Sequence, residues 1–428
     1  MNEYIKNLKT PIAVVGLGKS GDATLSLLSL CGIESSQVFT CDAKASNAQF
    51  ADPDIMISTV SPRTIVVSPG VPLSSSWVVK ARLSGVHITS DISLAASCMT
   101  SEKIIGVTGS VAKSTTVSIL GAALEGFSDS YFVGGNLGTP FSVYAADVLG
   151  KKRNRADWVV LELSSYQLEN SELLKLNHSA ITFLSPNHLE RYDNLNHYYE
   201  TKWKIESLTS GSVFINANGG DNKTYISKKN STRSVFSNPK MEELKPLALF
   251  EAQLIGSHNQ DNLALSALIA QACQWPSEAF AGMKNFKGLE HRLENCGIYH
   301  GVRYINDSKA TSMDSVLTAA QGVTSSYPES NIFLLLGGKD KNLPWEQLQD
   351  LKSIPNLKFL FFGECRKIAQ DKSQLKGDSF TTLQELLANL KFHIAKGDTV
   401  LLSPGGTSLD EFKSFEDRGK FFKEFISR

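Results

Sequence analysis

The sequence predicts an α/β protein made of parallel sheets with crossover helices. Three observations support this class: short apolar runs alternate with helical stretches along all 428 residues, glycine-rich turns follow two of these runs, and no fixed-period repeat interrupts them. The runs group into three blocks, which predict domains at residues 1–98, 99–288 and 289–428. The strands that we expect lie at residues 11–15, 38–41, 64–67, 104–108, 158–161, 301–305, 332–336, 357–362 and 399–402. A polar stretch, residues 223–237, is expected to be a surface excursion.

The composition excludes several classes of protein. Hydrophobic residues make up 42% of the chain and charged residues 20%, which is enough apolar material for a packed core. The 43 basic residues balance the 43 acidic ones, so neither nucleic acid nor a membrane surface is expected as the main partner. The six cysteines form no CxxC pair, and the charged start of the chain has no apolar segment of a signal peptide. We therefore expect a cytoplasmic monomer with free thiols and without a membrane span.

The first glycine-rich turn, Gly16–Gly21, fits the pattern GxGxxG and follows the strand expected at residues 11–15. Such glycines let a pyrophosphate approach backbone N–H groups at the start of a helix. Asp42 lies about 20 residues further on, where an acid that binds a ribose is expected. Taken alone, the turn fits an NAD-dependent oxidoreductase. Lys19 and Ser20 fit the diphosphate of a UDP-sugar instead, and a plain strand–turn–helix without a ligand is the structural alternative.

The second turn, residues 109–115, lies between an expected strand and a helix that starts at about Lys113, and we call it the phosphate loop. A P-loop needs backbone N–H groups around phosphate, a lysine on its oxygens and a hydroxyl for Mg²⁺. Lys113 and Ser114 provide the last two, although Val107 and Ala112 occupy positions where the strict pattern has glycines. Without further support, a capped helix with a solvated lysine would explain the segment equally well.

Two residues further along support a nucleotide site. Glu162 follows the strand expected at residues 158–161 and precedes a helix, and the end of a neighbouring strand is where a Mg²⁺ ligand belongs. Among the eight histidines, His188 is the one that we expect to face the same cleft. Taken alone, a carboxylate at this position is often a helix cap, and a lone histidine is more often structural.

Several ordered motifs together resemble the Mur ligase family over nearly the whole chain. The SPG turn, residues 68–70, is similar to a turn found in the members that use D-glutamate. Gly134-Gly135-Asn136-Leu137-Gly138 and Asn306-Asp307-Ser308-Lys309-Ala310-Thr311 are similar to two of the family's best-defined motifs. The other matching segments are residues 107–115, 161–169, 256–262, 286–294, 334–341 and 401–419.

This resemblance implies a three-domain architecture, with Rossmann-like N- and C-terminal domains around a central P-loop-type ATPase domain. It also implies an ATP- and Mg²⁺-dependent ligase that joins D-glutamate to UDP-N-acetylmuramoyl-L-alanine through an acyl phosphate. This reaction belongs to cytoplasmic peptidoglycan precursor synthesis, and hence to cell-wall biogenesis, cell shape and cell division. The first glycine-rich turn would then hold the UDP group rather than a nicotinamide cofactor.

The resemblance also implies a role for individual residues. The residues expected to be catalytic are Lys113, Glu162, His188 and Lys202, of which Lys202 would carry a carbamate. Two Mg²⁺ ions would be held by Ser114, Glu162, His188 and Lys202. The nucleotide would be bound by Gly109, Ser110, Lys113, Ser114, Thr115, Asn262, His291, Arg292, Asp307 and Lys309. The acceptor and D-glutamate would be bound by Gly18, Lys19, Ser20, Asp42, Ser68, Gly70, Asn136, Thr311, Lys341, Ser408 and Phe415.

The chain departs from the family pattern at positions that affect nucleotide binding. Val111 and Ala112 replace Asn and Gly, and the alanine costs about 1 kcal/mol if its position requires a positive φ. Asn187 replaces an Asp before His188. Two alternatives therefore remain open: a catalytically weakened Mur-like protein that binds UDP-linked precursors, and a sibling Mur or folylpolyglutamate-type amide ligase. Other departures are Ala43, Phe183 and Glu290.

Overall fold

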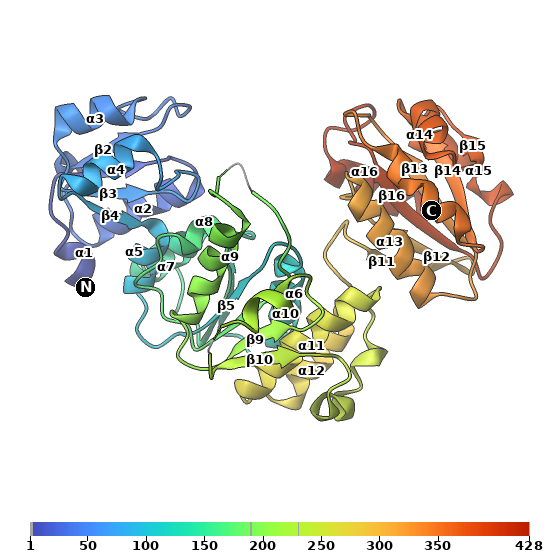
Figure 1. The fold of residues 1–428 in the computed structure, drawn as a ribbon, viewed down its shortest axis with the longest axis horizontal. Helices are drawn as coiled ribbons and strands as arrows, with labels where there is room; N and C mark the ends of the chain where they lie inside the picture. Colours follow the sequence, from blue (N-terminus) through green and yellow to red (C-terminus); the bar gives the residue numbers. More distant parts are fainter. Residues whose placement is uncertain (1–2, 189–190, 230, 428) are drawn as a thin grey trace. The chain divides into compact units, whose positions relative to one another are not determined.

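The computed structural model describes residues 3–188, 191–229 and 231–427, and these form two compact units. The first unit comprises residues 1–247 and 262–283, and the second comprises residues 248–261 and 284–428. The division falls inside two helices, α11 (Ser257–Ala272) and α12 (Ser277–Asn285), so each helix contributes residues to both units. Figure 1 shows the elements in chain order.

The first unit begins with a four-stranded parallel sheet in the order β2-β1-β3-β4. Val15, Cys41 and Val67 are register partners at the carboxyl ends of β1, β2 and β3, so the turns after these strands share one edge of the sheet. The strands β1, β2 and β3 were expected from the sequence, whereas β4 was not. The strands are β1 (Ile12–Val15), β2 (Val38–Cys41), β3 (Thr64–Val67) and β4 (His87–Ser90). The helices are α1 (Glu3–Lys6), α2 (Lys19–Leu30), α3 (Pro53–Val60), α4 (Ser76–Leu83) and α5 (Asp91–Ser97).

A second parallel sheet in the same unit has the order β10-β9-β8-β5-β7-β6. Its central strand β5 is buried from Ile104 onward, which matches the continuous apolar run in the sequence. The strands are β5 (Lys103–Thr108), β6 (Tyr131–Gly135), β7 (Trp158–Glu162), β8 (His178–Ile181), β9 (Val213–Asn216) and β10 (Ser234–Ser237). The helices of this part are α6 (Lys113–Glu125), α7 (Phe141–Leu149), α8 (Ser165–Leu168), α9 (Leu195–Trp203) and α10 (Asn222–Ile226), followed by α11 and α12.

One expectation about this sheet is wrong. Residues 223–237 were expected to be a surface excursion, but the described part of this stretch contains most of α10 and the edge strand β10. Val235 and Phe236 of β10 are only half-buried and pair in parallel with Phe214 and Ile215 of β9. A short, half-exposed edge strand among polar residues has little apolar periodicity, so the sequence did not indicate it.

The two sheets of the first unit share one hydrophobic core. Leu27 and Leu28 of α2, Leu94 of α5, and Phe141 and Tyr144 of α7 belong to a single cluster of buried apolar side chains. The same cluster also contains Val159 and Leu161 of β7, together with many other buried apolar residues. The same side chains therefore stabilise both sheets, each fully buried large side chain by roughly 1.5–3 kcal/mol.

The second unit contains a six-stranded sheet in the order β11-β12-β16-β13-β14-β15, in which only the β11–β12 pair is antiparallel. Most of its strands fall where the sequence predicted them. The strands are β11 (Glu294–Tyr299), β12 (Val302–Asn306), β13 (Ile332–Gly337), β14 (Leu357–Phe362), β15 (Gly377–Ser379) and β16 (Thr399–Gly405). The helices of this unit are α13 (Met313–Ser326), the 3₁₀ helix η5 (Trp345–Ser353), α14 (Arg366–Ser373), α15 (Leu383–Asn389) and α16 (Phe415–Ile426).

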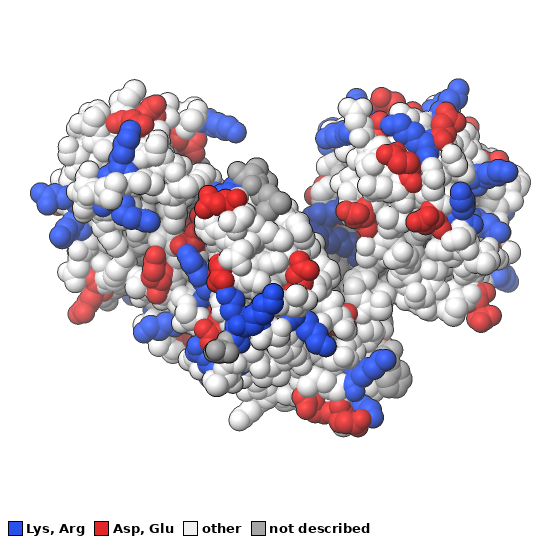
Figure 2. All heavy atoms as spheres, viewed as in Figure 1, with Lys and Arg blue, Asp and Glu red and all other residues white. Residues whose placement is uncertain are grey.

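Charges are mixed on the molecular surface. On the face drawn in Figure 2, lysines and arginines lie interspersed with aspartates and glutamates, in agreement with the balanced composition. Among the helices in the described part of the chain, none combines the length and the apolar character needed to cross a membrane.

Candidate functional site

The phosphate loop leads from β5 into α6 at the carboxyl edge of the second sheet. Its backbone is fastened to the segment that follows β8: the Ser110 N–H donates to the Phe183 carbonyl at 2.6 Å, and the Ser110 hydroxyl donates to the Ser185 carbonyl at 2.9 Å. The Tyr198 hydroxyl of α9 donates to the same serine Oγ at 3.1 Å. The loop is therefore pre-organised at the N-terminus of a 13-residue helix, which favours an anion.

Ala112 has a left-handed backbone with φ of 67°, a conformation that favours glycine, so the positive φ considered in the sequence analysis is present. Its neighbour Val111 is 51% exposed, although it is a large apolar residue. Val111 and Ala112, the two departures from the family pattern discussed above, are both part of the phosphate loop. The loop accommodates an alanine at the cost of backbone strain.

We expect Ala112→Gly to raise the free energy of unfolding by about 1 kcal/mol, because glycine adopts this conformation without steric cost. Ala122→Gly, in the interior of α6, is the matched control and is expected to lower the same quantity by about 1 kcal/mol. Urea denaturation of the two variants beside the parent protein measures both changes. A destabilised Ala112→Gly protein would contradict the assignment of strain to this residue.

Two lysines approach the phosphate loop from different elements. Lys113 Nζ donates to the carbonyl oxygens of Gly109 and Ser110 at 3.0 and 3.2 Å, and Lys202 Nζ donates to the Gly109 carbonyl at 2.8 Å. Lys202 lies in α9 and is only 2% exposed. Burial, and then the positive charge of Lys113, lower the pKa of Lys202 well below its usual value. An anion bound at the loop would relieve this repulsion.

Glu162 is the last residue of β7 and is buried, and two predicted site residues meet at its carboxylate. The Ser114 hydroxyl donates to Oε2 and the Asn136 side-chain amide donates to Oε1, both at 2.7 Å. Gly135 makes this approach feasible, because it has φ of 102° and a Cβ there would lie 2.5 Å from the Glu162 carbonyl oxygen. The sequence analysis ended this strand one residue too early, at Leu161, but it placed Glu162 at the correct edge of the sheet.

The donor set around Glu162 is chemically suited to Mg²⁺. A carboxylate and a serine hydroxyl are hard oxygen ligands, and Mg²⁺ with a nucleotide commonly takes only one or two protein ligands beside phosphate and water. Within the described residues, no three His, Cys, Asp or Glu side chains converge as a metal cluster. The carboxylate and the hydroxyl present here thus fit an Mg²⁺ ion that is bound together with a nucleotide.

His188 has a left-handed backbone with φ of 53°, and its Nδ1 lies 2.9 Å from the Tyr166 hydroxyl oxygen. The preceding Asn187 uses its side-chain oxygen to accept the His188 backbone N–H at 2.9 Å. The asparagine that replaces the family's aspartate therefore supports the local turn. The ring of His188 also lies near the ring of Tyr198, which bonds to the phosphate loop.

The first glycine-rich turn is shaped by Asp42 and the SPG turn. Asp42 Oδ2 accepts the Leu17 N–H at 2.7 Å, and this bond is the main reason for the lowered pKa of Asp42. Gly16 has φ of 93°, its carbonyl accepts the Ser68 hydroxyl at 2.8 Å, and a Cβ on it would lie 2.8 Å from Ser68 Cβ. Gly18 and Lys19 are exposed at the start of α2, and Ser20 is half-buried there.

In the second unit, four predicted nucleotide residues lie around the segment after β12. Asp307 is buried and accepts the Leu293 N–H at 3.1 Å and the Ser403 hydroxyl at 2.7 Å, and burial raises its pKa to about 7. His291 is buried beside Asn306, 2.9 Å from Nδ1 to Nδ2, and its own carbonyl accepts the Lys309 N–H. Lys309 Nζ lies 4.9 Å above the ring of Phe415. The Arg292 charge lowers the pKa of Asp307, against the larger effect of burial.

The remaining predicted residues are less closely grouped. Thr311 and Lys341 are exposed in the second unit, and Ser408 is buried. Ser408 begins a turn in which its carbonyl accepts the Phe412 N–H, and α16 starts only at Phe415. In the first unit, Thr115 is half-buried in α6 and Asn262 is buried in α11.

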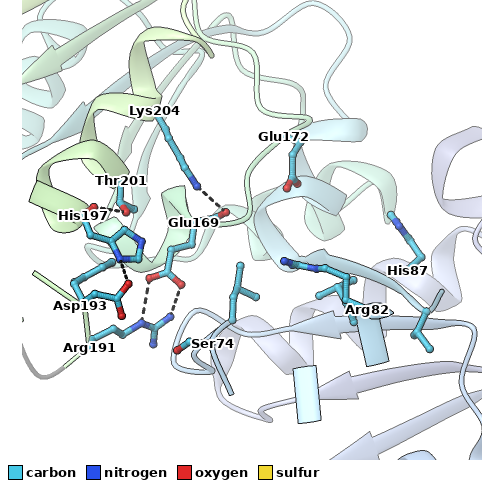
Figure 3. A pocket seen from close by; sticks show the side chains of 14 residues that line it. Ser74, Arg82, His87, Glu169, Glu172, Arg191, Asp193, His197, Thr201 and Lys204 are labelled. Atoms are coloured by element: carbon cyan, nitrogen blue, oxygen red, sulfur yellow. Dashed lines mark hydrogen bonds and ion pairs between the residues drawn. The ribbon is translucent and has the colours of Figure 1, made fainter. Parts of the chain in front are cut away.

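The ion pair between Arg191 and Glu169 was not predicted from the sequence. Arg191 forms a two-bond ion pair with Glu169, and Figure 3 shows this pair at the wall of a crevice of about 560 Å³. The crevice is lined on one side by residues of α4, β4 and the segments beside them. On the other side it is lined by residues of α9, of the segments before and after α9, and of the segment that follows α8. No pattern in the sequence indicates that Arg191 pairs with Glu169, because the two residues are distant in the sequence and come together only in the folded chain.

The fold and the site together define a nucleotide-dependent α/β enzyme, with a loop, two lysines and a carboxylate at the carboxyl edge of a parallel sheet. Residues 107–270 match the Mur ligase middle domain. The chain is 32% identical to a UDP-N-acetylmuramoylalanine–D-glutamate ligase of Koribacter versatilis strain Ellin345, covering 97% of each chain, and 31% identical to one of Pasteurella multocida strain Pm70, covering 99% of this chain and 98% of that one. The chain belongs to the Mur ligase family, as its motifs predicted.

Solved structures agree with this fold. A UDP-N-acetylmuramoyl-L-alanyl-D-glutamate–2,6-diaminopimelate ligase aligns with a TM-score of 0.58 at 15% identity, covering 99% of this chain and 93% of that one. A MurF ligase from Thermotoga maritima in complex with ADP aligns with a TM-score of 0.56 at 14% identity, covering 91% of this chain and 95% of that one. The predicted α/β class with several parallel sheets is thereby confirmed.

Proposed function

We propose that the protein is an ATP-dependent ligase that joins D-glutamate to UDP-N-acetylmuramoyl-L-alanine in peptidoglycan precursor synthesis. The observation that carries this proposal is the grouping of Lys113, Lys202, Ser114, Asn136 and Glu162 at one edge of the second sheet, in a chain aligned from end to end with relatives of that name. The NAD-dependent oxidoreductase is not favoured, because nothing beyond the first sheet supports it.

The reaction requires that a poor electrophile, a carboxylate, be made reactive toward an amine. ATP supplies the phosphoryl group for an acyl phosphate, and Mg²⁺ neutralises charge on the transferred group. In this proposal Lys113 and the N–H groups of Gly109, Ser114 and Thr115 orient the nucleotide phosphates. Their position at the start of α6 supports this assignment. The Ser110 N–H is bonded to the Phe183 carbonyl, so Ser110 would act by holding the loop in shape.

Glu162 and Ser114 are our proposed ligands for one Mg²⁺ ion, and His188 and Lys202 for a second. Lys202 would act as a carbamate, which converts a buried cation into an anionic oxygen ligand. Its burial beside Lys113 supports this step, because an uncharged amine is the form that reacts with carbon dioxide. Asn136, held on the Glu162 carboxylate, is proposed to orient the acceptor substrate.

The substrate roles extend over both units. Gly18, Lys19, Ser20, Asp42, Ser68 and Gly70 are proposed to bind the UDP end of the acceptor. Asn262, His291, Arg292, Asp307 and Lys309 are proposed to contact the nucleotide. Thr311, Lys341, Ser408 and Phe415 are proposed to bind D-glutamate, for which a cation and hydroxyl groups are suitable partners. We retain the division into domains 1–98, 99–288 and 289–428, and a cytoplasmic monomer, as parts of the proposal.

The test is a phosphate-release assay with the full chain, ATP, Mg²⁺ and UDP-N-acetylmuramoyl-L-alanine, to which D-glutamate, L-glutamate or L-lysine is added in turn. We expect release only with D-glutamate. Release with another amino acid would indicate the sibling ligase, and binding of the acceptor without any release would indicate the weakened precursor-binding protein.

A further inference from the structure

Tyr166 and Arg191 connect His188 to the SPG turn. The Tyr166 hydroxyl oxygen lies 2.9 Å from His188 Nδ1, and the ring centroids of the two residues are 5.1 Å apart. Tyr166 lies in α8, directly after the segment that carries Glu162, whereas His188 lies after β8. The tyrosine thus joins the ends of two strands that flank β5 on opposite sides.

Arg191 holds this tyrosine from the other side. Its guanidinium carbon lies 4.1 Å from the centroid of the Tyr166 ring, and its Nε and Nη2 donate to the Glu169 carboxylate at 3.1 and 2.8 Å. Nη1 and Nη2 also donate to the carbonyl oxygens of Gly70 and Val71, at 3.4 and 3.2 Å. The side chains of Arg191 and Glu169 are 9% and 13% exposed, so solvent screens this pair weakly. Only a planar, forked cation can stack and donate in this way.

We propose that Tyr166 is a positioning residue that fixes the tautomer and ring orientation of His188, and that Arg191 links this orientation to the docking of the SPG turn. In this arrangement His188 Nδ1–H donates to the Tyr166 oxygen, and Nε2 retains the lone pair that a cation needs. The inference rests on the proposed function, because it gives His188 the role of a metal ligand. The family pattern accepts Phe or Tyr at position 166, so the hydroxyl is a feature of this chain rather than of the whole family.

The direct test is the nitrogen-15 NMR spectrum of the imidazole rings in full-length protein without nucleotide or metal. The protein has eight histidines, and His188→Gln assigns the signal of interest by its disappearance. We expect the parent protein to hold His188 with the proton on Nδ1. Tyr166→Phe should shift His188 toward the Nε2–H tautomer, with the other seven histidine signals in place as a check of folding.

The kinetic test compares Tyr166→Phe with Tyr199→Phe, which removes a hydroxyl that donates to Asp221 at 2.6 Å in the same unit. We expect Tyr166→Phe to raise the Mg²⁺ concentration for half-maximal activity about tenfold, with the KM for D-glutamate unchanged, and Tyr199→Phe to alter neither. A purely structural role for the hydroxyl would instead lower stability without this selective change.

Arg191→Lys tests the second part, since lysine keeps the charge but neither stacks nor donates in a fork. We expect a partial loss of the Nδ1–H signal of His188 and a higher KM for the UDP-linked substrate. An unchanged His188 spectrum in Tyr166→Phe overturns the whole proposal, and an unchanged spectrum in Arg191→Lys alone overturns the link to the SPG turn. If the parent protein lacks D-glutamate ligase activity, the proposed function fails, whereas the NMR spectra still decide the Tyr166–His188 contact.

Discussion

Glu162→Gln is expected to lower D-glutamate-dependent phosphate release about 1,000-fold, equivalent to roughly 4 kcal/mol of transition-state stabilisation. The substitution preserves the shape of a side chain that is 3% exposed, removes its charge and replaces one acceptor oxygen by an NH₂ group. Ser114 and Asn136 both donate to this carboxylate, so an amide at the same place also turns one of its own N–H groups toward a donor. The fold should remain, and the loss should appear in kcat.

Glu102→Gln is the matched control for this experiment. Glu102 is also a buried, hydrogen-bonded carboxylate, which accepts from Arg155 and from the Thr100 backbone, but it precedes β5 at the opposite edge of the same sheet. We expect this variant to retain most of the activity at a temperature where it is folded. If Glu162→Gln retained more than about a tenth of the parent rate, Glu162 would lie outside the reacting centre.

Arg418→Met is expected to destabilise the second unit by about 3–5 kcal/mol. Arg418 in α16 is completely buried, and its guanidinium donates to the Ser308 hydroxyl and carbonyl and to the Gly406 carbonyl, at 2.8 to 3.1 Å. Burial lowers the pKa of Arg418 to about 10, so it remains protonated at neutral pH. Methionine fills much of the volume but leaves these acceptors without a donor.

Hydrogen exchange at the amides of β12, β13 and β16 measures this effect within the second unit. Arg366→Met is the control, because Arg366 is half-buried and donates a single bond, to the Gly363 carbonyl at 2.9 Å. We expect protection to fall strongly in Arg418→Met and by less than about 1 kcal/mol in Arg366→Met. Equal protection in the two variants would show that the buried guanidinium does not hold this unit together.

The success of the sequence-based predictions depended on local pattern. The runs at residues 64–67 and 357–362 coincide with β3 and β14, because buried parallel strands are continuously apolar. The convergence of Ser114 and Glu162 followed from a simple rule, that the carboxyl ends of parallel strands share one edge. By contrast, β6 and β8 mix apolar residues with glycine, serine or histidine, so their pattern does not distinguish them from loops.

The residue order alone was sufficient for the α/β class, for the family, and for the place of Lys113, Ser114 and Glu162 at the carboxyl edge of the second sheet, since each depends on spacing within a short segment. Folding was needed to join Arg191 to Glu169 and Tyr166 to His188, and to merge two sheets around one core. These contacts link residues more than 20 positions apart. Their formation depends on side-chain packing in three dimensions, which hydrophobic periodicity along the chain does not encode.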